Sequence, residues 1–156
     1  MNKIMRNISG KILVLVVKLL YMLLPLFISK DKTTVQIGRI LTKLSVLSLS
    51  TLIPKVKTKS DFNIFRKKIK KSFELSKALY DYKIIEDNEK KIQFEIHSCP
   101  FTGALKSGGY EHLCKYLCAG DFVIAKRNKE KWLFKREHSL GTTGKYCNHA
   151  YFSINE

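Results

Sequence analysis

The first half of the chain is built from apolar residues in long runs or at helical spacing. Residues 12–28 form one almost continuous apolar run. Residues 33–53 follow with isoleucine and leucine at helical spacing, and Pro54 ends this segment because proline disfavours helical geometry in the residue before it. Residues 60–79 place phenylalanine, isoleucine and leucine on one side and lysine on the other. The first half is therefore predicted to consist of helices.

The second half changes to the two-residue period that is typical of strands. Residues 91–97 alternate apolar and polar side chains, and three more segments are rich in β-branched and aromatic residues. The predicted strands are 80–86, 91–97, 132–139 and 146–154. Between the two pairs, the segment Gly103–Gly109 indicates a loop, and residues 110–119 indicate a short helix whose end lies between Ala119 and Val123. The order of helices and then β-β-α-β-β predicts an α+β fold with an antiparallel sheet.

The apolar run at 12–28 also bears on the location of the protein. It contains Lys18 and follows several basic residues. Three interpretations stay open: a membrane-associated helix that spans the bilayer or lies at its interface, a core helix, or a cleaved signal. We divide the chain into residues 1–30, an apolar membrane-associated or core helix, and residues 31–156, an α+β domain that contains the cysteines. We expect that domain in the cytoplasm, attached to the membrane through residues 12–28, by the positive-inside rule.

The formal net charge of +16 indicates an anionic partner. Residues 55–71 carry eight lysine and arginine residues against Asp61 alone. A solvated helix face explains such a cluster, and so does an anionic membrane surface, which attracts each basic residue by about 1 kcal/mol. We expect the membrane surface as a partner. Nucleic acid is not expected, because no aromatic-basic motif or helix-turn-helix spacing is present.

The candidate chemistry lies in the last 58 residues, which hold all four cysteines. Cys99 follows a predicted strand, Cys114 and Cys118 lie on the predicted helix, and Cys147 opens the last strand. Asp121 comes three residues after Cys118 and shares its face if the helix continues. We expect reduced thiols, because a chain of this length does not need disulfides for stability.

Two chemistries suit this group of thiols. In the first, the thiolate of Cys99 or Cys118 attacks an electrophilic carbon, while Asp121 or a histidine moves protons and no cofactor is required. The histidines available for this role are His97, His112, His138 and His149. In the second, Cys99, Cys114, Cys118 and Cys147 hold zinc or an iron–sulfur cluster. Their spacing matches no standard zinc ribbon or ferredoxin motif.

Four further residues are predicted to contact the substrate. They are His97 at the end of a strand, Gly144 and Lys145 in the loop that joins the last two strands, and Asn148. Backbone N–H groups of the loop 141–144 are suited to a carboxylate, because oriented amides form anion-binding sites.

Three short motifs, in this order, resemble the L-2-amino-thiazoline-4-carboxylic acid hydrolase family. They are Ile96–Pro100, Leu113–Asp121 and Thr143–Asn148, and the likeness covers about residues 60–154. The resemblance implies a small-molecule substrate and hydrolytic opening of a cyclic amidine, the 2-aminothiazoline ring, to N-carbamoyl-cysteine. It also implies an active-site set of Cys99, Cys118, Asp121 and Cys147. The chain departs from the family at Asn148, where an acidic residue is usual.

Two functions of other classes remain alternatives. One is a non-catalytic domain at the membrane that binds zinc or an iron–sulfur cluster and senses a ligand. The other is a membrane adaptor that binds lipid through its basic face and needs none of its cysteines.

Overall fold

The computed structural model of the chain describes residues 2–142 and 144–154 and contains helices followed by a mixed helix-and-strand half. The first half comprises α1 (Asn2–Leu23), the 3-10 turn η1 (Leu24–Leu26), α2 (Lys30–Leu52), η2 (Lys59–Asp61) and α3 (Phe62–Leu75). The second comprises β1 (Asp81–Asp87), β2 (Lys91–Ser98), α4 (Pro100–Ser107), η3 (Glu111–Leu113), α5 (Cys114–Cys118), α6 (Gly120–Arg127), β3 (Leu133–Lys135) and β4 (Cys147–Phe152).

The four strands form one antiparallel sheet in the order β1-β2-β4-β3. This confirms the predicted α+β class. Strand β4 pairs with β2 so that Cys147 lies opposite Ile96 and His149 lies opposite Phe94. Because side chains alternate along a strand, these residues and Tyr151 share one face of the sheet. That face carries the fully buried side chains of the strands.

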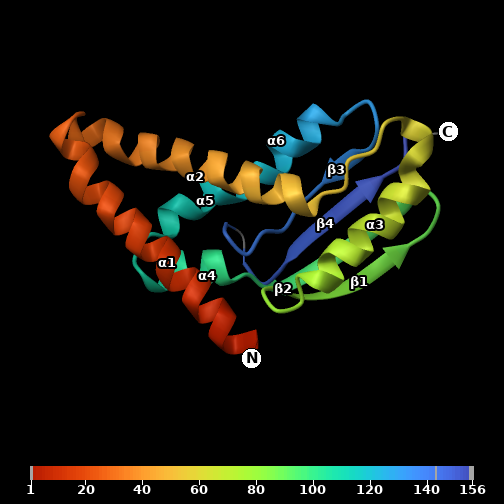
Figure 1. Ribbon diagram of the computed structural model, residues 1–156, viewed down its shortest axis with the longest axis horizontal. Helices are drawn as coiled ribbons and strands as arrows, with labels where there is room; N and C mark the ends of the chain where they lie inside the picture. Colours follow the sequence, from red (N-terminus) through yellow and green to blue (C-terminus); the bar gives the residue numbers. More distant parts are fainter. Residues whose placement is uncertain (1, 143, 155–156) are drawn as a thin grey trace.

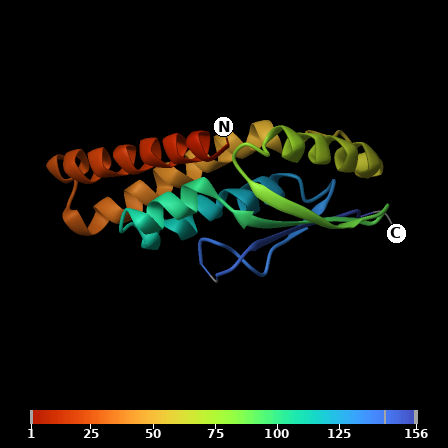
Figure 2. The same ribbon diagram turned by 90° about the horizontal axis from the view of Figure 1, so that it is seen from below.

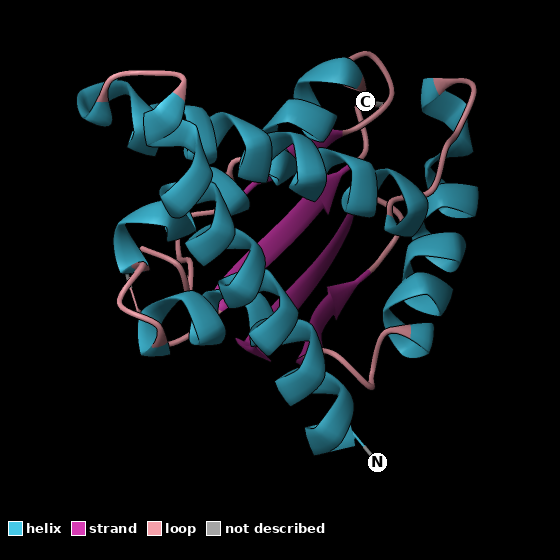
Figure 3. Ribbon diagram, turned by 60° about the vertical axis from the view of Figure 1, so that its left-hand side comes forward, coloured by secondary structure: helices cyan, strands magenta, loops and turns pink. Residues whose placement is uncertain are grey.

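Helices α1, α2 and α3 lie together on one side of the sheet, as Figure 2 shows. In Figure 1, α3 runs along the sheet, while α1 and α2 form the two arms of a V that extends beyond it. The arms are supported by the helices of the second half: α1 packs mainly on α4, and α2 packs on α5 and α6. In Figure 3 the strands of the sheet are seen behind helices that cross in front of them.

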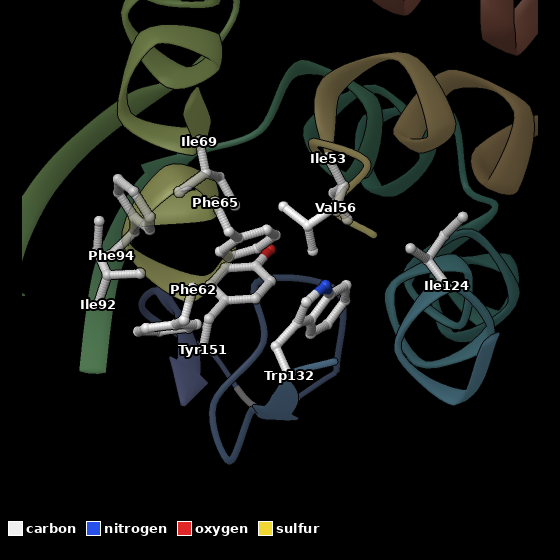
Figure 4. Close-up of a cluster of buried hydrophobic side chains, with 10 residues drawn as sticks. All are labelled: Ile53, Val56, Phe62, Phe65, Ile69, Ile92, Phe94, Ile124, Trp132 and Tyr151. Carbon is white, nitrogen blue, oxygen red and sulfur yellow. The ribbon is translucent and has the colours of Figure 1, made fainter. Parts of the chain in front are cut away.

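Two buried apolar clusters hold these layers together. The first joins α3 to the sheet and centres on Phe65, whose ring stacks on Trp132 and is tilted against Tyr151 (Figure 4). The second joins α1 and α2 to the short helices through Val17, Leu41 and neighbouring leucines. A fully buried apolar side chain of this size contributes about 1.5–3 kcal/mol, so these clusters fix where the three helices sit.

The structure corrects the prediction for the segment between the strand pairs. The expected loop at Gly103–Gly109 is mostly helix α4, which begins at Pro100 with Cys99 as its N-cap residue. Leu105 is fully buried on this helix, so tertiary packing outweighs the low helix propensity of Gly103. The single helix expected at 110–119 is divided into η3, α5 and α6.

The strand predicted at 132–139 is also shorter than expected. Only Leu133–Lys135 pairs with β4. The chain then leaves the sheet, because Arg136 turns inward to a carboxylate and the N–H groups of Glu137 and His138 both donate to the side chain of Asn148. Strands β1 and β2 agree with their predicted segments to within one residue at each end.

Candidate functional site

A cavity of about 270 Å³ lies between the three long helices, the short helices and the buried face of the sheet. Most of its wall is apolar, and leucines from α2 supply the largest part. Its polar and reactive lining residues are Ser45, Ser48, Ser72, Ser76, Tyr80, Cys99, Thr102, Cys118, Asp121, Arg136, Cys147, His149 and Tyr151. The four residues predicted as the catalytic set, Cys99, Cys118, Asp121 and Cys147, therefore line a single cavity.

The fold brings these residues together from four elements. Cys99 stands between the end of β2 and the start of α4, and Cys147 begins β4 opposite Ile96, at the same end of the sheet. Cys118 ends α5, and Asp121 lies in the first turn of α6. The antiparallel pairing of β2 with β4 is what places the two strand-borne thiols close together, although 47 residues separate them in the chain.

A buried ionic group forms the polar end of the cavity. Arg136 donates from Nη1 to Oδ2 of Asp121 and from Nη2 to the carbonyl oxygen of Cys118 at 2.8 Å. Nε2 of His149 lies 3.9 Å from the same carboxylate oxygen. Both the aspartate and the arginine side chains are less than a tenth exposed. The second carboxylate oxygen of Asp121, Oδ1, is buried and has no hydrogen-bond partner among the described residues, which leaves it ready to accept a hydrogen bond from a ligand.

Burial raises the pKa of each of the three thiols in the cavity, so each is protonated at neutral pH in the absence of a ligand. The thiols differ in what opposes this effect. At Cys99, hydrogen bonding by the backbone N–H and hydroxyl of Thr102 and by the N–H of Phe101 lowers the pKa. At Cys118 the hydroxyl of Ser139 and the charge of Arg136 act in this direction.

Burial also keeps the imidazole of His149 neutral. Desolvation lowers its pKa, and the positive charge of Arg136 adds to this effect, while Asp121 opposes it. A neutral imidazole that lines the same cavity as the thiols is suited to accept a proton from a thiol within its reach. Tyr80 and Tyr151, which also line the cavity, have raised pKa values because they are buried, so both are neutral hydroxyls.

Cys114 lies apart from the other three thiols. It is fully buried in the cluster of α1, α2 and α4, with its sulfur 3.8 Å from the carbonyl oxygen of Thr102, and it does not line the cavity. Among the described residues, no three His, Cys, Asp or Glu side chains are grouped as metal ligands. The four-cysteine set of the metal alternative, Cys99, Cys114, Cys118 and Cys147, thus gains no support from the geometry.

The four predicted substrate-binding residues do not line this cavity. His97 is on β2 with its ring directed to Glu95, at 3.0 Å, on the side of the strand away from the helices. Gly144 and Lys145 are exposed, and their neighbour Thr143 lies outside the described residues. Asn148 accepts hydrogen bonds from the backbone N–H groups of Glu137 at 2.9 Å and His138 at 2.7 Å. An acidic residue at this position offers the same acceptor, so the change to asparagine removes no group from the cavity.

Arg136 is the residue that the sequence analysis missed. Nothing in the pattern of residues 132–139 distinguishes a buried arginine from a solvated one, because its partner Asp121 belongs to another element. For His149 a signal did exist: Cys147, His149 and Tyr151 alternate along a strand, so a buried cysteine implies that the histidine two residues later is buried on the same face.

The fold and the cavity define an α+β protein with a partly open cavity suited to a small organic molecule, lined by apolar side chains and, at one end, by ionisable ones. The chain belongs to the L-2-amino-thiazoline-4-carboxylic acid hydrolase family, whose model matches residues 9–151. This confirms the resemblance and extends it over the amino-terminal helices. The family name indicates a hydrolase-like protein with a small-molecule substrate. No curated protein and no solved structure matches the chain.

Proposed function

We propose that this protein hydrolyses a cyclic amidine of the thiazoline type, with Cys99 as the nucleophile. The observation that carries this proposal is the position of Cys99 at the amino-terminus of α4, inside the cavity that also holds the Asp121–Arg136 pair. Hydrogen-bond donors at a helix amino-terminus stabilise a thiolate, and a cysteine activated in this way is a strong nucleophile. Cys118 ends α5 and Cys147 begins β4, so neither is the N-cap residue of a described helix.

The ionic group supplies binding and proton transfer. The unpaired Oδ1 of Asp121 accepts a hydrogen bond from an amidine N–H, and Arg136 holds the carboxylate in this orientation. A protonated amidine is also attracted by the carboxylate charge, which makes its carbon more electrophilic. His149, neutral and in the same cavity, takes the thiol proton.

The reaction proceeds in two displacements that together consume one water. In the first, His149 removes the proton of Cys99, the sulfur bonds to the amidine carbon, and the bond from that carbon to the ring sulfur breaks. The ring sulfur leaves with the electron pair of that bond and takes the proton from His149. In the second, water attacks the same carbon, the bond to Cys99 breaks, and the products are an N-carbamoyl compound with a free thiol and the restored cysteine.

The residues that line the cavity restrict which substituent the substrate ring can carry. Arg136 is the one lysine or arginine among the described lining residues, and it is already paired with Asp121. A substrate carboxylate finds no free cation there, and Lys145 lies elsewhere. We therefore infer that the preferred substrate carries an apolar substituent, which packs on the leucines of α2 and on Phe73.

Chemical labelling combined with turnover tests this proposal. Protein purified without oxygen is treated with iodoacetamide at several pH values, and the modified cysteine is located by mass spectrometry. We expect Cys99 to react first, and we expect Cys99→Ser to abolish thiol release from 2-amino-thiazolines while Cys114→Ser retains it. 2-Amino-thiazolines with an alkyl or phenyl substituent should be opened faster than the 4-carboxylate. Full turnover by Cys99→Ser contradicts the assignment of the nucleophile. If the wild type does not open any of these compounds, the proposed reaction is contradicted.

A further inference from the structure

The positive charge of this protein is concentrated in its first three helices. Residues 1–75 contain sixteen lysine and arginine residues and only three acidic residues, a net charge of +13, whereas residues 76–156 add +3. The three helices lie on the same side of the molecule (Figure 2). Exposed basic side chains there include Arg39 and Lys43 on α2 and Lys67, Lys68 and Lys71 on α3. One face of the protein is thus strongly basic.

Helix α1 adds an apolar stripe to this face. Ile8, Ile12, Leu15, Leu19 and Met22 follow one another at intervals of three or four residues, which places them on one side of the helix. They are between 43% and 62% exposed, which is unusual for so many large apolar side chains in a row. An exposed stripe of this length indicates a surface that is covered in the functional state.

Lysines border the stripe on one side. Lys11 lies three residues after Ile8 and four before Leu15, and Lys18 bears the same relation to Leu15 and Met22. Both lysines are exposed. An apolar stripe with lysines at its edge is the pattern of a helix that lies in the plane of a membrane interface, because the lysines reach the head groups while the apolar side chains enter the acyl region.

The opposite side of α1 is fixed to the rest of the fold. Val17 is fully buried, a Cβ atom added to Gly10 would lie 2.7 Å from the Cβ of Ala104, and Nε of Arg6 donates to the carbonyl oxygen of Ala78 at 3.2 Å. Among the described residues, Ile4–Leu26 is one stretch that is long and apolar enough to cross a membrane, and 11% of it is buried. Crossing a bilayer requires that these contacts break, whereas lying on the bilayer keeps them.

We propose that the face formed by α1, α2 and α3 docks on an anionic phospholipid bilayer, with the stripe of α1 in the interface and the basic side chains on the head groups. The charge selects this occupant over a second copy of the chain, because two copies of a helical segment of net charge +13 repel each other. Docking does not depend on the proposed ring opening, and each can fail without the other.

Flotation with vesicles of phosphatidylcholine, with and without phosphatidylglycerol, tests this proposal on the full chain. We expect binding to the anionic vesicles alone, with strong weakening between about 0.1 M and about 0.5 M salt. Changing Lys67, Lys68 and Lys71 to glutamine should weaken binding roughly 100-fold, at about fivefold for each charge. Changing Ile8, Leu15 and Leu19 to glutamine should abolish binding, because it removes the apolar stripe, in which these side chains are 43–58% exposed.

Matched changes of Lys83, Lys90 and Lys145 to glutamine remove the same charge outside the three helices and should leave binding within twofold of wild type. Circular dichroism of each variant confirms that it is folded. The proposal is overturned if anionic vesicles do not bind the wild type, if the control variant loses as much as the α3 variant, or if high salt fails to release the protein, as for a spanning helix. A stripe-dependent dimer in light scattering without lipid also overturns it.

Discussion

Replacing Arg136 by methionine should destabilise this protein strongly. The guanidinium is 6% exposed and makes two hydrogen-bonded contacts, to the carboxylate of Asp121 and to the carbonyl oxygen of Cys118, and it lies 4.7 Å from the ring centre of Phe122. Methionine fills much of the volume but leaves the aspartate charge buried without a partner. Removing one member of a buried ion pair costs about 3–5 kcal/mol, a large part of the stability of a domain of this size.

The double variant Arg136→Met with Asp121→Asn separates this cause from a loss of packing. Without either charge, no uncompensated ion remains, so the double variant should be more stable than Arg136→Met alone by about 2 kcal/mol or more. The free energy of unfolding is measured from urea denaturation followed by circular dichroism. As a control, Lys129→Met breaks an ion pair with Glu130 in which both side chains are mostly exposed, and it should leave the transition midpoint unchanged.

The reasoning is refuted if Arg136→Met costs less than about 1 kcal/mol, the value of an exposed pair. It is also refuted if the double variant is as unstable as the sum of the single ones, because the two side chains then act independently. Either result would place water or another counter-charge beside Asp121. Either result would also contradict the proposed function, in which Arg136 orients this carboxylate and the carboxylate binds the amidine.

Two further predictions concern stability near the thiols. Gly141→Ala should destabilise the protein by about 1–3 kcal/mol in urea denaturation, because the added Cβ would lie 2.7 Å from Sγ of Cys118 and 3.2 Å from Cβ of Cys114. Gly103→Ala, in helix α4 with open space around the added Cβ, should instead stabilise by about 0.5–1 kcal/mol, and the opposite order of the two variants would contradict the packing. Burial raises the pKa of Cys114 to about 11, so its thiol stays protonated in the folded state where the unfolded thiol ionises, near a pKa of about 8.5. The free energy of unfolding should therefore fall as pH rises from about 9 to about 11, and it should fall less steeply for Cys114→Ala; equal slopes would contradict the buried thiol.

Much of the fold was predictable from local patterns. The helical spacing in residues 33–53 and the alternation in residues 91–97 each match an element in position and type, because burial of one face imposes the period of that element. Helix α4 was not predictable in this way. Its glycine and its single buried leucine carry almost no local signal, and the surface of α1 on which it packs is brought there by the tertiary fold.

The sequence by itself determined the family and the α+β class and supplied the candidate reactive residues, since each of these depends on residue type and order along the chain. The tertiary structure alone decided which of those residues share a cavity. Cys99, Cys118 and Cys147 line this cavity, while Cys114 packs in an apolar cluster. The side chain of Asn148 lies elsewhere and accepts hydrogen bonds from the backbone N–H groups of residues 137–138. The physical reason is that proximity across elements follows from sheet register and helix packing, which pair residues far apart in sequence. The partner of Asp121 had to come from such a distant element, because a buried carboxylate needs a counter-charge and its own helix offers none on that side.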